Sequence, residues 1–327
     1  MAKLVTIFGG SGFVGRYIAR RMAKQGWRVR VAVRRPNEAL FVKTYGVVGQ
    51  VEPILCNIRN DASVDEALNG ADAAVNCVGI LIEEKKNTFS AIQHSGAERI
   101  GRLSKKHGIK SLVHISAIGA DENSKSIYSS TKAKGENAIV SNFPNAIILR
   151  PSVVFGQEDQ FFNRFAKMAT MAPFLPLVGA NTRFQPVFVD DVAKAAEAAL
   201  LGSVKEGTYE LGGPEIKDFR ELMIDMLRII KRRRLIINTP RFIAKLMAFG
   251  LSTLQLFTLG LFKNSIITKD QIENLGIDNI VSEQAKGFKN LNVDPLDMGS
   301  VLPEYLWRYR PSGQYDAIKD SAKNLRS

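Results

Sequence analysis

A short apolar run that leads into three evenly spaced glycines constrains the fold most. Leu4–Phe8 has the composition of a buried β-strand, and Gly9, Gly12 and Gly15 follow at intervals of three residues. Gly9 permits a tight turn, Gly12 lets backbone approach a pyrophosphate, and Gly15 lets the next helix lie against the strand. Free N–H groups at the start of that helix would face the phosphates. The stretch therefore predicts a strand–turn–helix unit that binds a nucleotide; a turn that serves only the fold is the alternative.

The first half of the chain alternates β-strand and helix patterns. The expected strands are Leu4–Phe8, Arg28–Val33, Val51–Cys56, Ala73–Val78, Ser111–Ser116 and Ala146–Leu149. The expected helices are Val14–Gln25, Asp61–Leu68, Ala91–His107 and Ser130–Asn142. This alternation is typical of right-handed crossovers that place helices on both faces of a parallel sheet. We predict an α/β fold: a Rossmann-type doubly wound parallel sheet over residues 1–201 and a smaller, mostly helical C-terminal lobe over residues 202–327.

The residues that follow the second and third strands indicate which nucleotide is bound. Arg34 and Arg35 stand about 20 residues beyond the glycines, where a protein that prefers NAD usually has Asp or Glu. Arginine can pair with a 2′-phosphate, so this position favours NADP(H); a solvated basic turn is the alternative. Asn57 is placed to contact the adenine, with Ile58 packed on the ring. The opening turn and the strand ends together predict cofactor contacts from Gly9, Ser11, Gly12, Phe13, Val14, Gly15, Arg34, Arg35, Asn57, Ile58, Cys77, Val78 and Gly79.

A serine, a tyrosine and a lysine form the candidate catalytic group. Ser116 ends the fifth expected strand, and Tyr128 and Lys132 follow, four residues apart. That spacing places both side chains on one face of a helix. An ammonium beside a phenol lowers the pKa of the phenol, which gives an acid/base that works near neutral pH. Ser116 would hold a substrate carbonyl or hydroxyl while hydride passes to or from the nicotinamide, and Lys132 would also bind the nicotinamide ribose.

With these residues in place, the sequence resembles the extended short-chain dehydrogenase/reductase family. The similarity covers Lys3 to Leu201 and includes Leu149–Gly156 and Val187–Ala193. The resemblance implies that the first of these segments, with Pro151 and Val153, lines the nicotinamide pocket. It implies that the second begins a helix on the substrate side. Ser116, Tyr128 and Lys132 would then contact the cofactor whether or not turnover follows.

Further motifs resemble a narrower family, the NADPH-binding accessory subunit of respiratory complex I in its bacterial form. They are Gly12–Tyr17, Phe143–Ile148, Phe155–Ala166, Pro173–Leu177, Gln185–Val189 and Ile267–Gln271. The resemblance implies NADPH held mainly for structure, and other complex I subunits as partners. It also implies a peripheral location on the cytoplasmic face of the inner (plasma) membrane, near the quinone site. Two alternatives remain: a free-standing NADP-dependent oxidoreductase or epimerase that uses Ser116, Tyr128 and Lys132, and an NADP(H)-sensing regulatory module.

The charge balance calls for an anionic partner. The chain of 327 residues has a net charge of +13. Without zinc-finger spacing or an aromatic RNA-binding signature, we expect no nucleic acid partner; acidic protein surfaces, anionic lipid head groups and the phosphates of a cofactor remain. A basic charge that serves no docking role is the alternative. Cys56 and Cys77 lie in apolar runs, which indicates buried thiols of a reducing compartment. The three histidines are not spaced as a metal site. No apolar leader precedes Leu4, so we expect that the product stays where it is synthesised, or that the numbering begins after processing.

The second half of the chain combines basic and apolar segments. A strand and turn are expected over Thr208–Pro214, and a helix over Phe219–Ile230 that begins near Asp218. Lys231–Arg234 then precedes the uncharged run Leu246–Phe262, which is shorter than the roughly 20 residues that span a bilayer. Docking on a membrane surface or a membrane-embedded partner, with Lys231–Arg234 near anionic head groups, is one interpretation, and burial in the lobe is another. The polar tail from residue 311 onward would wrap a partner or stay loose.

Overall fold

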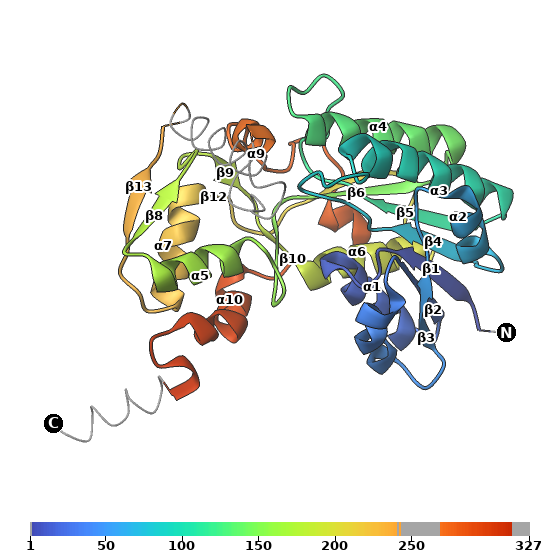
Figure 1. The fold of residues 1–327 in the computed structure, drawn as a ribbon, viewed down its shortest axis with the longest axis horizontal. Helices are drawn as coiled ribbons and strands as arrows, with labels where there is room; N and C mark the ends of the chain where they lie inside the picture. The colour runs from blue at the N-terminus through green and yellow to red at the C-terminus, as the bar shows by residue number, and fades with distance from the viewer. Residues whose placement is uncertain (1, 241, 243–268, 316–327) are drawn as a thin grey trace. The chain divides into compact units, whose positions relative to one another are not determined.

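The chain divides into two compact units. The computed structural model describes residues 2–240, 242 and 269–315 (Figure 1). The first unit comprises Met1–Ser152, Val189–Gly212 and Val281–Pro295, and the second comprises Val153–Phe188, Gly213–Ile280 and Leu296–Ser327. The chain thus passes between the units more than once, rather than at a single boundary after residue 201. Each unit has an apolar core of its own.

A parallel sheet of seven strands forms the centre of the first unit. The strands are β1 (Leu4–Phe8), β2 (Arg28–Val33), β3 (Val51–Leu55), β4 (Ala73–Asn76), β5 (Ser111–Ile115), β6 (Ile147–Pro151) and β11 (Gly207–Leu211). Their order in the sheet is β11-β6-β5-β4-β1-β2-β3, and every neighbouring pair is parallel. The predicted doubly wound α/β fold is confirmed. Because the order reverses between β1 and β4, a crevice for a ligand is expected at the carboxyl ends of these two strands.

Helices cover both faces of this sheet (Figure 1). Helices α1 (Phe13–Lys24) and α6 (Val189–Leu200) pack together on one face, and α2 (Asp61–Leu68), α3 (Ser95–Lys106) and α4 (Ile127–Asn142) on the other. The predicted helix Ala91–His107 is in fact a π-helical turn, η2 (Ser90–His94), that continues into α3. Helix α4 begins three residues earlier than predicted, because the hydroxyl of Ser126 caps it by accepting the Ser129 N–H at 3.2 Å.

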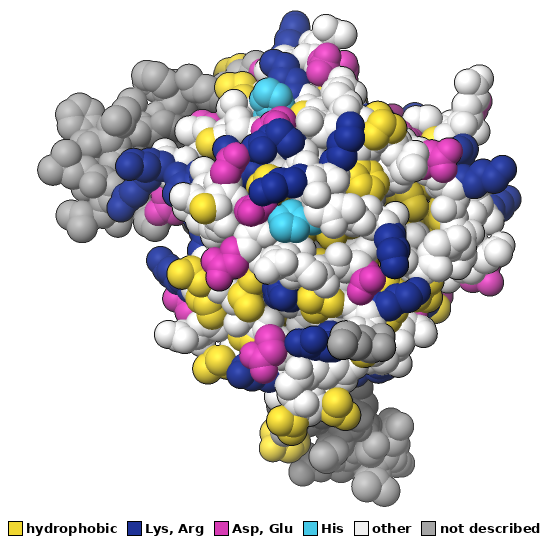
Figure 2. Space-filling view, turned by 90° about the vertical axis from the view of Figure 1, so that its right-hand side faces the viewer, with side chains coloured by type: hydrophobic (Ala, Val, Ile, Leu, Met, Phe, Trp, Pro, Cys, Tyr) yellow, Lys and Arg dark blue, Asp and Glu magenta, His cyan; other side chains and the backbone are white. Residues whose placement is uncertain are grey.

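The surface of α2 and α3 carries charges that neutralise one another. Asp61 pairs with Arg99 and Arg102, and Asp65 pairs with Lys106 and His107. Figure 2 turns the side of Figure 1 where α2 and α3 lie toward the viewer and shows basic and acidic side chains interspersed. These pairs hold the two helices together and leave little uncompensated charge between them.

Short strand pairs and helices build the second unit around a phenylalanine-rich core. The pairs are β7 (Val154–Phe155) with β10 (Val187–Phe188), β8 (Phe174–Leu177) with β13 (Leu235–Asn238) and β9 (Arg183–Phe184) with β12 (Lys217–Asp218). The helices are α5 (Phe162–Met171), α7 (Phe219–Ile229), α9 (Lys269–Asn274) and α10 (Met298–Leu306). Helix α7 begins as the sequence predicted, because Asp218 and Glu221 form a capping box. In the core, the ring of Phe219 lies within 6 Å of the rings of Phe161, Phe165 and Phe184.

The basic run Lys231–Arg234 lies within the part of the chain that the structure describes. Of the basic run Lys231–Arg234, two guanidinium groups are used within the unit: Arg232 donates to the carbonyl of Tyr309 at 2.8 Å and Arg234 to that of Ala169 at 2.7 Å. The apolar run at residues 246–262 and the tail beyond residue 315 lie outside the described residues. In the part of the chain that is described, no helix is long and apolar enough to cross a membrane.

Candidate functional site

The glycine turn after β1 has the geometry that its sequence predicted. Gly9 adopts a φ of +75°, which glycine tolerates best, and its N–H donates to the carbonyl of Ala32 at 2.9 Å. A Cβ at Gly15 would lie 2.4 Å from the carbonyl oxygen of Gly9, so only glycine lets α1 approach the turn this closely. A Cβ at Gly9 would meet the side chain of Val78 at 3.2 Å, which places the turn beside the end of β4.

The start of α1 offers an uncapped helix end beside this turn. Gly12 is the N-cap residue and supplies no side-chain cap, and the first turn of the helix has no acidic residue. Gly12 is exposed, and the adjoining Ser11, Phe13 and Val14 are half-buried. Free N–H groups and the positive end of the helix dipole therefore face the space over the turn, an arrangement that favours a phosphate group.

The two arginines after β2 differ in what they contact. Both side chains are exposed. Arg35 pairs with Glu38 at 3.0 Å, whereas Arg34 makes no ion pair with any described residue. Arg34 is therefore the guanidinium that is available for a phosphate, because Arg35 already has a carboxylate partner.

Asn57 and Ile58, which follow β3, are partly engaged within the fold. The side-chain oxygen of Asn57 accepts the N–H of Arg59 at 3.1 Å. Ile58 is buried, and its side chain lies against α3 so closely that a Cβ at Gly96 would come within 2.8 Å of it. Ile58 thus fixes the spacing between the end of β3 and α3. The side-chain nitrogen of Asn57 is the group that could contact an adenine, because the side-chain oxygen already accepts a hydrogen bond.

Lys132 connects α4 to the ends of β4 and β5. Its ammonium donates to the carbonyl of Ile115 at 3.0 Å, next to Ser116, and a Cβ at Gly79 would lie 3.6 Å from it. Lys132 is only 5% exposed. Burial lowers its pKa to about 8, although Glu136 and the Cys77 thiol act in the opposite direction. Burial also raises the pKa of the Cys77 thiol to about 12.

Two polar side chains of β5 and its end are buried beside Lys132 without a hydrogen-bond partner among the described residues. They are the hydroxyl of Ser116 and the imidazole of His114. Burial, together with the nearby Lys132 ammonium, holds the pKa of His114 well below its ordinary value, so the ring is neutral. Residues two apart on a strand point to the same face, so both groups face α4. A buried hydroxyl without a partner is what a site for a polar ligand group requires.

Tyr128 lies one turn before Lys132 on α4, as the sequence predicted. Its ring meets the ring of Phe89 edge to face, with centroids 6.0 Å apart. One turn on, the hydroxyl of Thr131 donates to the side chain of Gln93 at 2.9 Å, and Gln93 donates in turn to the carbonyl of Ile80 at 2.9 Å. Gln93 therefore fastens the loop after β4 to the helix that carries Tyr128 and Lys132. No sequence signal identified Gln93, which has the pattern of a polar position on an amphipathic helix.

A partly buried ion pair fixes the middle of the same helix. Arg150 of β6 donates from Nε and Nη2 to both carboxylate oxygens of Glu136, at 2.6 to 3.2 Å. Glu136 is buried one turn after Lys132. The pair fixes α4 against the end of β6, where Pro151 is buried. Val153, the remaining predicted contact, belongs to the second unit.

These observations test whether a dinucleotide fits the first unit. The turn at Gly9 and Gly15 leaves room only for backbone, the start of α1 is uncapped, Arg34 is unpaired among described residues, and the Ser116 hydroxyl is buried without a partner there. All lie at the carboxyl ends of the parallel strands, on one unit. These residues of the first unit therefore fit a bound dinucleotide.

Comparison with known proteins agrees with this geometry. Residues 5–212 match the NAD dependent epimerase/dehydratase family. The chain belongs to this family. A UDP-glucose 4-epimerase of Thermus thermophilus, solved in complex with NAD, superposes with a TM-score of 0.62 at 17% identity, over 93% of this chain and 98% of the epimerase. At that identity the likeness shows the fold alone.

Two relatives extend the similarity beyond residue 212. The chain is 34% identical, over 95% of its length and 79% of the relative, to NADH dehydrogenase (ubiquinone) 1 alpha subcomplex subunit 9, mitochondrial, of Arabidopsis thaliana. It is 32% identical, over 98% of its length and 83% of the relative, to the NADH-ubiquinone oxidoreductase 40 kDa subunit of Neurospora crassa. The resemblance to a complex I accessory subunit is therefore confirmed as homology within the NAD dependent epimerase/dehydratase family. The bacterial form stays a prediction.

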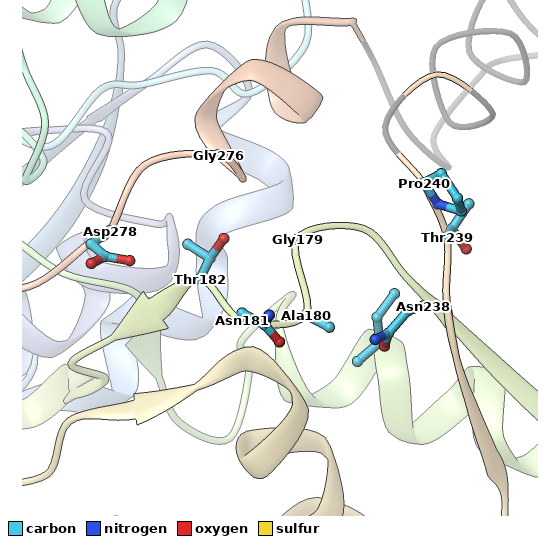
Figure 3. A pocket seen from close by; sticks show the side chains of 10 residues that line it. Gly179, Ala180, Asn181, Thr182, Asn238, Thr239, Pro240, Gly276 and Asp278 are labelled. Atoms are coloured by element: carbon cyan, nitrogen blue, oxygen red, sulfur yellow. The ribbon is translucent and has the colours of Figure 1, made fainter.

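A separate hollow lies within the second unit. It has a volume of about 430 Å³ and is lined by Leu177, Gly179, Ala180, Asn181, Thr182, Asn238, Thr239, Pro240, Gly276 and Asp278 (Figure 3). Several of its polar side chains are already bonded: Thr182 donates to the carbonyl of Leu275 at 2.5 Å, and Asp278 pairs with Arg183 at 2.7 Å. These bonds connect β9 and the residue before it with the segment after α9. Thr182 and Asp278 in the lining of this pocket therefore stabilise the fold of the second unit.

Proposed function

We propose that this chain is an NADP(H)-binding accessory subunit of respiratory complex I. The observation that carries the proposal is the 34% identity to a complex I subunit over 95% of the chain, which runs through both units. The UDP-glucose 4-epimerase covers a similar share of this chain but at only 17% identity, so its likeness does not carry a function. The proposed partners are the other complex I subunits of the hydrophilic arm and the membrane junction.

The proposed cofactor is NADPH. Arg34 supports this choice, because an unpaired guanidinium at the end of β2 can meet a 2′-phosphate where NAD-preferring proteins place a carboxylate. The uncapped start of α1 would hold the pyrophosphate. Lys132 and Tyr128 would hold the nicotinamide ribose, and Ser116 would offer its buried hydroxyl to a polar group beside the nicotinamide. When bound, the nicotinamide supplies the capacity for hydride transfer, but the proposed role is mainly structural: the bound group closes the crevice between β1 and β4.

We further propose a peripheral location on the cytoplasmic face of the inner (plasma) membrane, near the quinone site, in a bacterial complex I. This part rests on the resemblance of the motifs. Contacts with anionic lipid head groups from Lys231–Arg234 would be limited to the side chains not used within the unit, since Arg232 and Arg234 donate to backbone carbonyls.

A single extraction tests the proposal. Membranes from cells that make the chain are solubilised in mild detergent and separated on a native gel, and nucleotide is extracted from the band that contains the chain. We expect the chain in the band with NADH:quinone oxidoreductase activity, with about one NADPH or NADP per chain. A chain that migrates alone, or that carries no phosphorylated dinucleotide, would refute the proposal.

The complete Ser116–Tyr128–Lys132 group favours a second candidate, a free-standing NADP-dependent oxidoreductase or epimerase. Tyr128→Phe separates the two functions, because phenylalanine keeps the ring contact with Phe89 and removes only the hydroxyl. If the role is structural, the variant assembles into the complex and retains its nucleotide. If the chain turns over a substrate, the variant loses on the order of 10²-fold or more in rate while it stays folded and nucleotide-bound.

A further inference from the structure

Most of the net positive charge of this chain lies in its first sixty residues. Residues 1–60 contain 11 Lys and Arg but only 2 Asp and Glu, a net charge of +9 out of +13 for the whole chain. These residues form β1, α1, β2, η1 (Pro36–Tyr45) and β3. The dinucleotide site uses the glycine turn and the carboxyl ends of the strands in this region, and of its unpaired basic side chains only Arg34, so most of this charge needs another explanation.

A basic stripe runs along the outer side of α1. Arg16, Arg20 and Lys24 recur every four residues, which aligns them on one face of the helix. The opposite side of the helix buries Ile18, Ala19 and Met22 against the sheet. Arg20 and Lys24 are exposed and make no ion pair with any described residue.

Acidic side chains border this stripe on both sides. On one side, Arg21 is neutralised by Asp190 and Glu197 of α6, at 2.5 and 2.9 Å. On the other side, Lys43 of η1 pairs with Glu52 at 3.4 Å. These acids already have basic partners, so they do not offset the charge of Arg20 and Lys24.

Exposed apolar side chains lie directly beside the stripe. The guanidinium of Arg16 sits over the ring of Phe41, 4.9 Å from its centroid, which places η1 along the first half of α1. At the other end, Gln50 donates to the carbonyl of Ala23 at 2.6 Å and accepts the N–H of Val47 at 2.9 Å. This pair of bonds holds the turn before β3 beside the end of α1.

The apolar residues of η1 and the turn are largely open to solvent. Leu40 is 52% exposed, Val47 is 73% exposed, and Val48 is fully exposed. On the opposite face of the sheet, by contrast, acidic and basic side chains of α2 and α3 pair with one another. Adjacent exposed apolar groups with arginines at their rim are typical of surfaces that bind another protein.

We propose that the surface formed by Arg16, Arg20, Lys24, Leu40, Phe41, Val47 and Val48, here called the α1–η1 face, docks an acidic and partly apolar surface of another protein. Carboxylates of that partner would pair with Arg20 and Lys24, and its apolar side chains would cover Phe41 and the Val47–Val48 turn. We favour a protein over a bilayer surface because exposed apolar groups lie beside arginines, one of them stacked on the Phe41 ring, an arrangement typical of protein interfaces. Binding to lipid vesicles is an outcome of the test below.

This inference goes beyond the proposed function, since it assigns a surface and a partner chemistry that do not depend on the nucleotide. A zero-length carbodiimide cross-linker tests it in membranes from cells that make the full chain, because this reagent joins a lysine amine only to a carboxylate in direct contact. We expect cross-linked peptides that join Lys24 to an Asp or Glu of a second polypeptide. Lys105 of α3 and Lys134 of α4 are also exposed and serve as internal controls that should give no such product.

Charge reversal supplies the second measurement. Arg20→Glu combined with Lys24→Glu should lower the amount of chain in the high-mass native band by about tenfold or more, with the bound nucleotide retained. Lys105→Glu combined with Lys134→Glu changes the net charge equally and should leave the band unchanged. Val47→Ser combined with Val48→Ser should give a smaller loss, because it removes only the apolar part of the contact.

Two outcomes decide against the proposal. If no Lys24 cross-link forms and the wild-type chain floats with phosphatidylserine vesicles while the Arg20→Glu, Lys24→Glu variant does not, the face binds lipid. If the variant matches its control in the native gel, the face binds nothing. A Lys24 cross-link to a protein outside complex I would uphold this inference and refute the proposed assembly, so the two can fail separately.

Discussion

The ammonium of Lys132 donates a 3.0 Å hydrogen bond to the carbonyl oxygen of Ile115, the residue before Ser116. This bond fixes a buried cation from α4 at the carboxyl end of β5. Glu136, the nearest acid on the same helix, is committed to Arg150. The ammonium is thus held in place by a neutral carbonyl, and its charge is only partly offset.

Stability should therefore depend on pH through Lys132. Its pKa is lowered from 10.5 to about 8 in the folded chain by burial. Between these values the unfolded chain binds more protons than the folded chain, so the free energy of unfolding rises as pH rises from 8 to about 10.5. The cost of the buried charge below pH 8 is on the order of 3 kcal/mol.

Replacement by an apolar side chain of similar length checks this expectation. Lys132→Met should raise the free energy of unfolding of nucleotide-free protein by about 2 kcal/mol at pH 7, because it removes the buried charge but leaves the Ile115 carbonyl unpaired. Urea unfolding of both proteins at about pH 7 and about pH 9.5 measures the effect. A difference between wild type and variant that stays constant with pH would show that Lys132 titrates normally.

Gly15→Ala should abolish nucleotide binding. The new Cβ would lie 2.4 Å from the carbonyl oxygen of Gly9 and 2.8 Å from the Cα of Gly10, so the backbone of the turn must move. We expect a loss of about 2–3 kcal/mol in stability as well. Isothermal titration with NADPH and urea unfolding measure the two effects.

Gly108→Ala provides the control for that substitution. Gly108 has a φ of +63° and open space around its Cα, so alanine there should cost about 1 kcal/mol through backbone strain alone. NADPH binding should be unchanged. Equal loss of binding in both variants would mean that the Gly15 effect reflects general destabilisation.

Arg34→Gln should weaken NADPH binding by about tenfold to a hundredfold and leave NADH binding unchanged, because a charge-assisted bidentate contact with the 2′-phosphate is lost. Arg35→Gln is the matched control, since Arg35 already pairs with Glu38. Competition between NADPH and NADH on each purified variant measures the preference. Equal effects of the two substitutions would contradict the assignment of the phosphate contact to Arg34.

Breaking the Glu136–Arg150 pair should destabilise the first unit strongly. Glu136 is buried and binds Arg150 through both oxygens, so Glu136→Gln leaves the guanidinium with only the longer contact to Glu210 at 3.7 Å and should cost about 2 kcal/mol. Glu98→Gln, which breaks the exposed pair with Arg102, should cost less than about 1 kcal/mol. Urea unfolding measures the loss in the free energy of unfolding for both variants. Similar losses would show that the burial of Glu136 does not strengthen its ion pair.

The sequence predicted the sheet well because each strand is a short apolar run closed by a turn. β1 and β2 have the predicted bounds, and Tyr128 and Lys132 share one helix as their spacing required. The π-helical turn at Ser90 could not be predicted, since a shift from four- to five-residue hydrogen bonding leaves the apolar periodicity nearly intact.

Long-range partners were outside the reach of sequence patterns. His114 lies in a strand that is buried on both faces, where apolar alternation carries no information, so its place beside Lys132 was missed. Arg34 and Arg35 are equivalent in sequence, and only the structure distinguishes them through Glu38. The Glu136–Arg150 pair joins α4 to a strand that follows it, which residue spacing does not encode.

The first unit is built from segments that are far apart in the sequence, and this affects how it folds during synthesis. β11 and the segment Val281–Pro295 belong to that unit, and the N–H of Ser282 donates to Glu210 of β11 at 2.8 Å. During synthesis, the glycine turn and α1 therefore emerge from the ribosome long before β11 and Val281–Pro295, which belong to the same unit. The complete nucleotide site is therefore expected to form only late in synthesis. A chain truncated after residue 201 would lack β11, and β6 would then be an unpaired edge strand of the sheet.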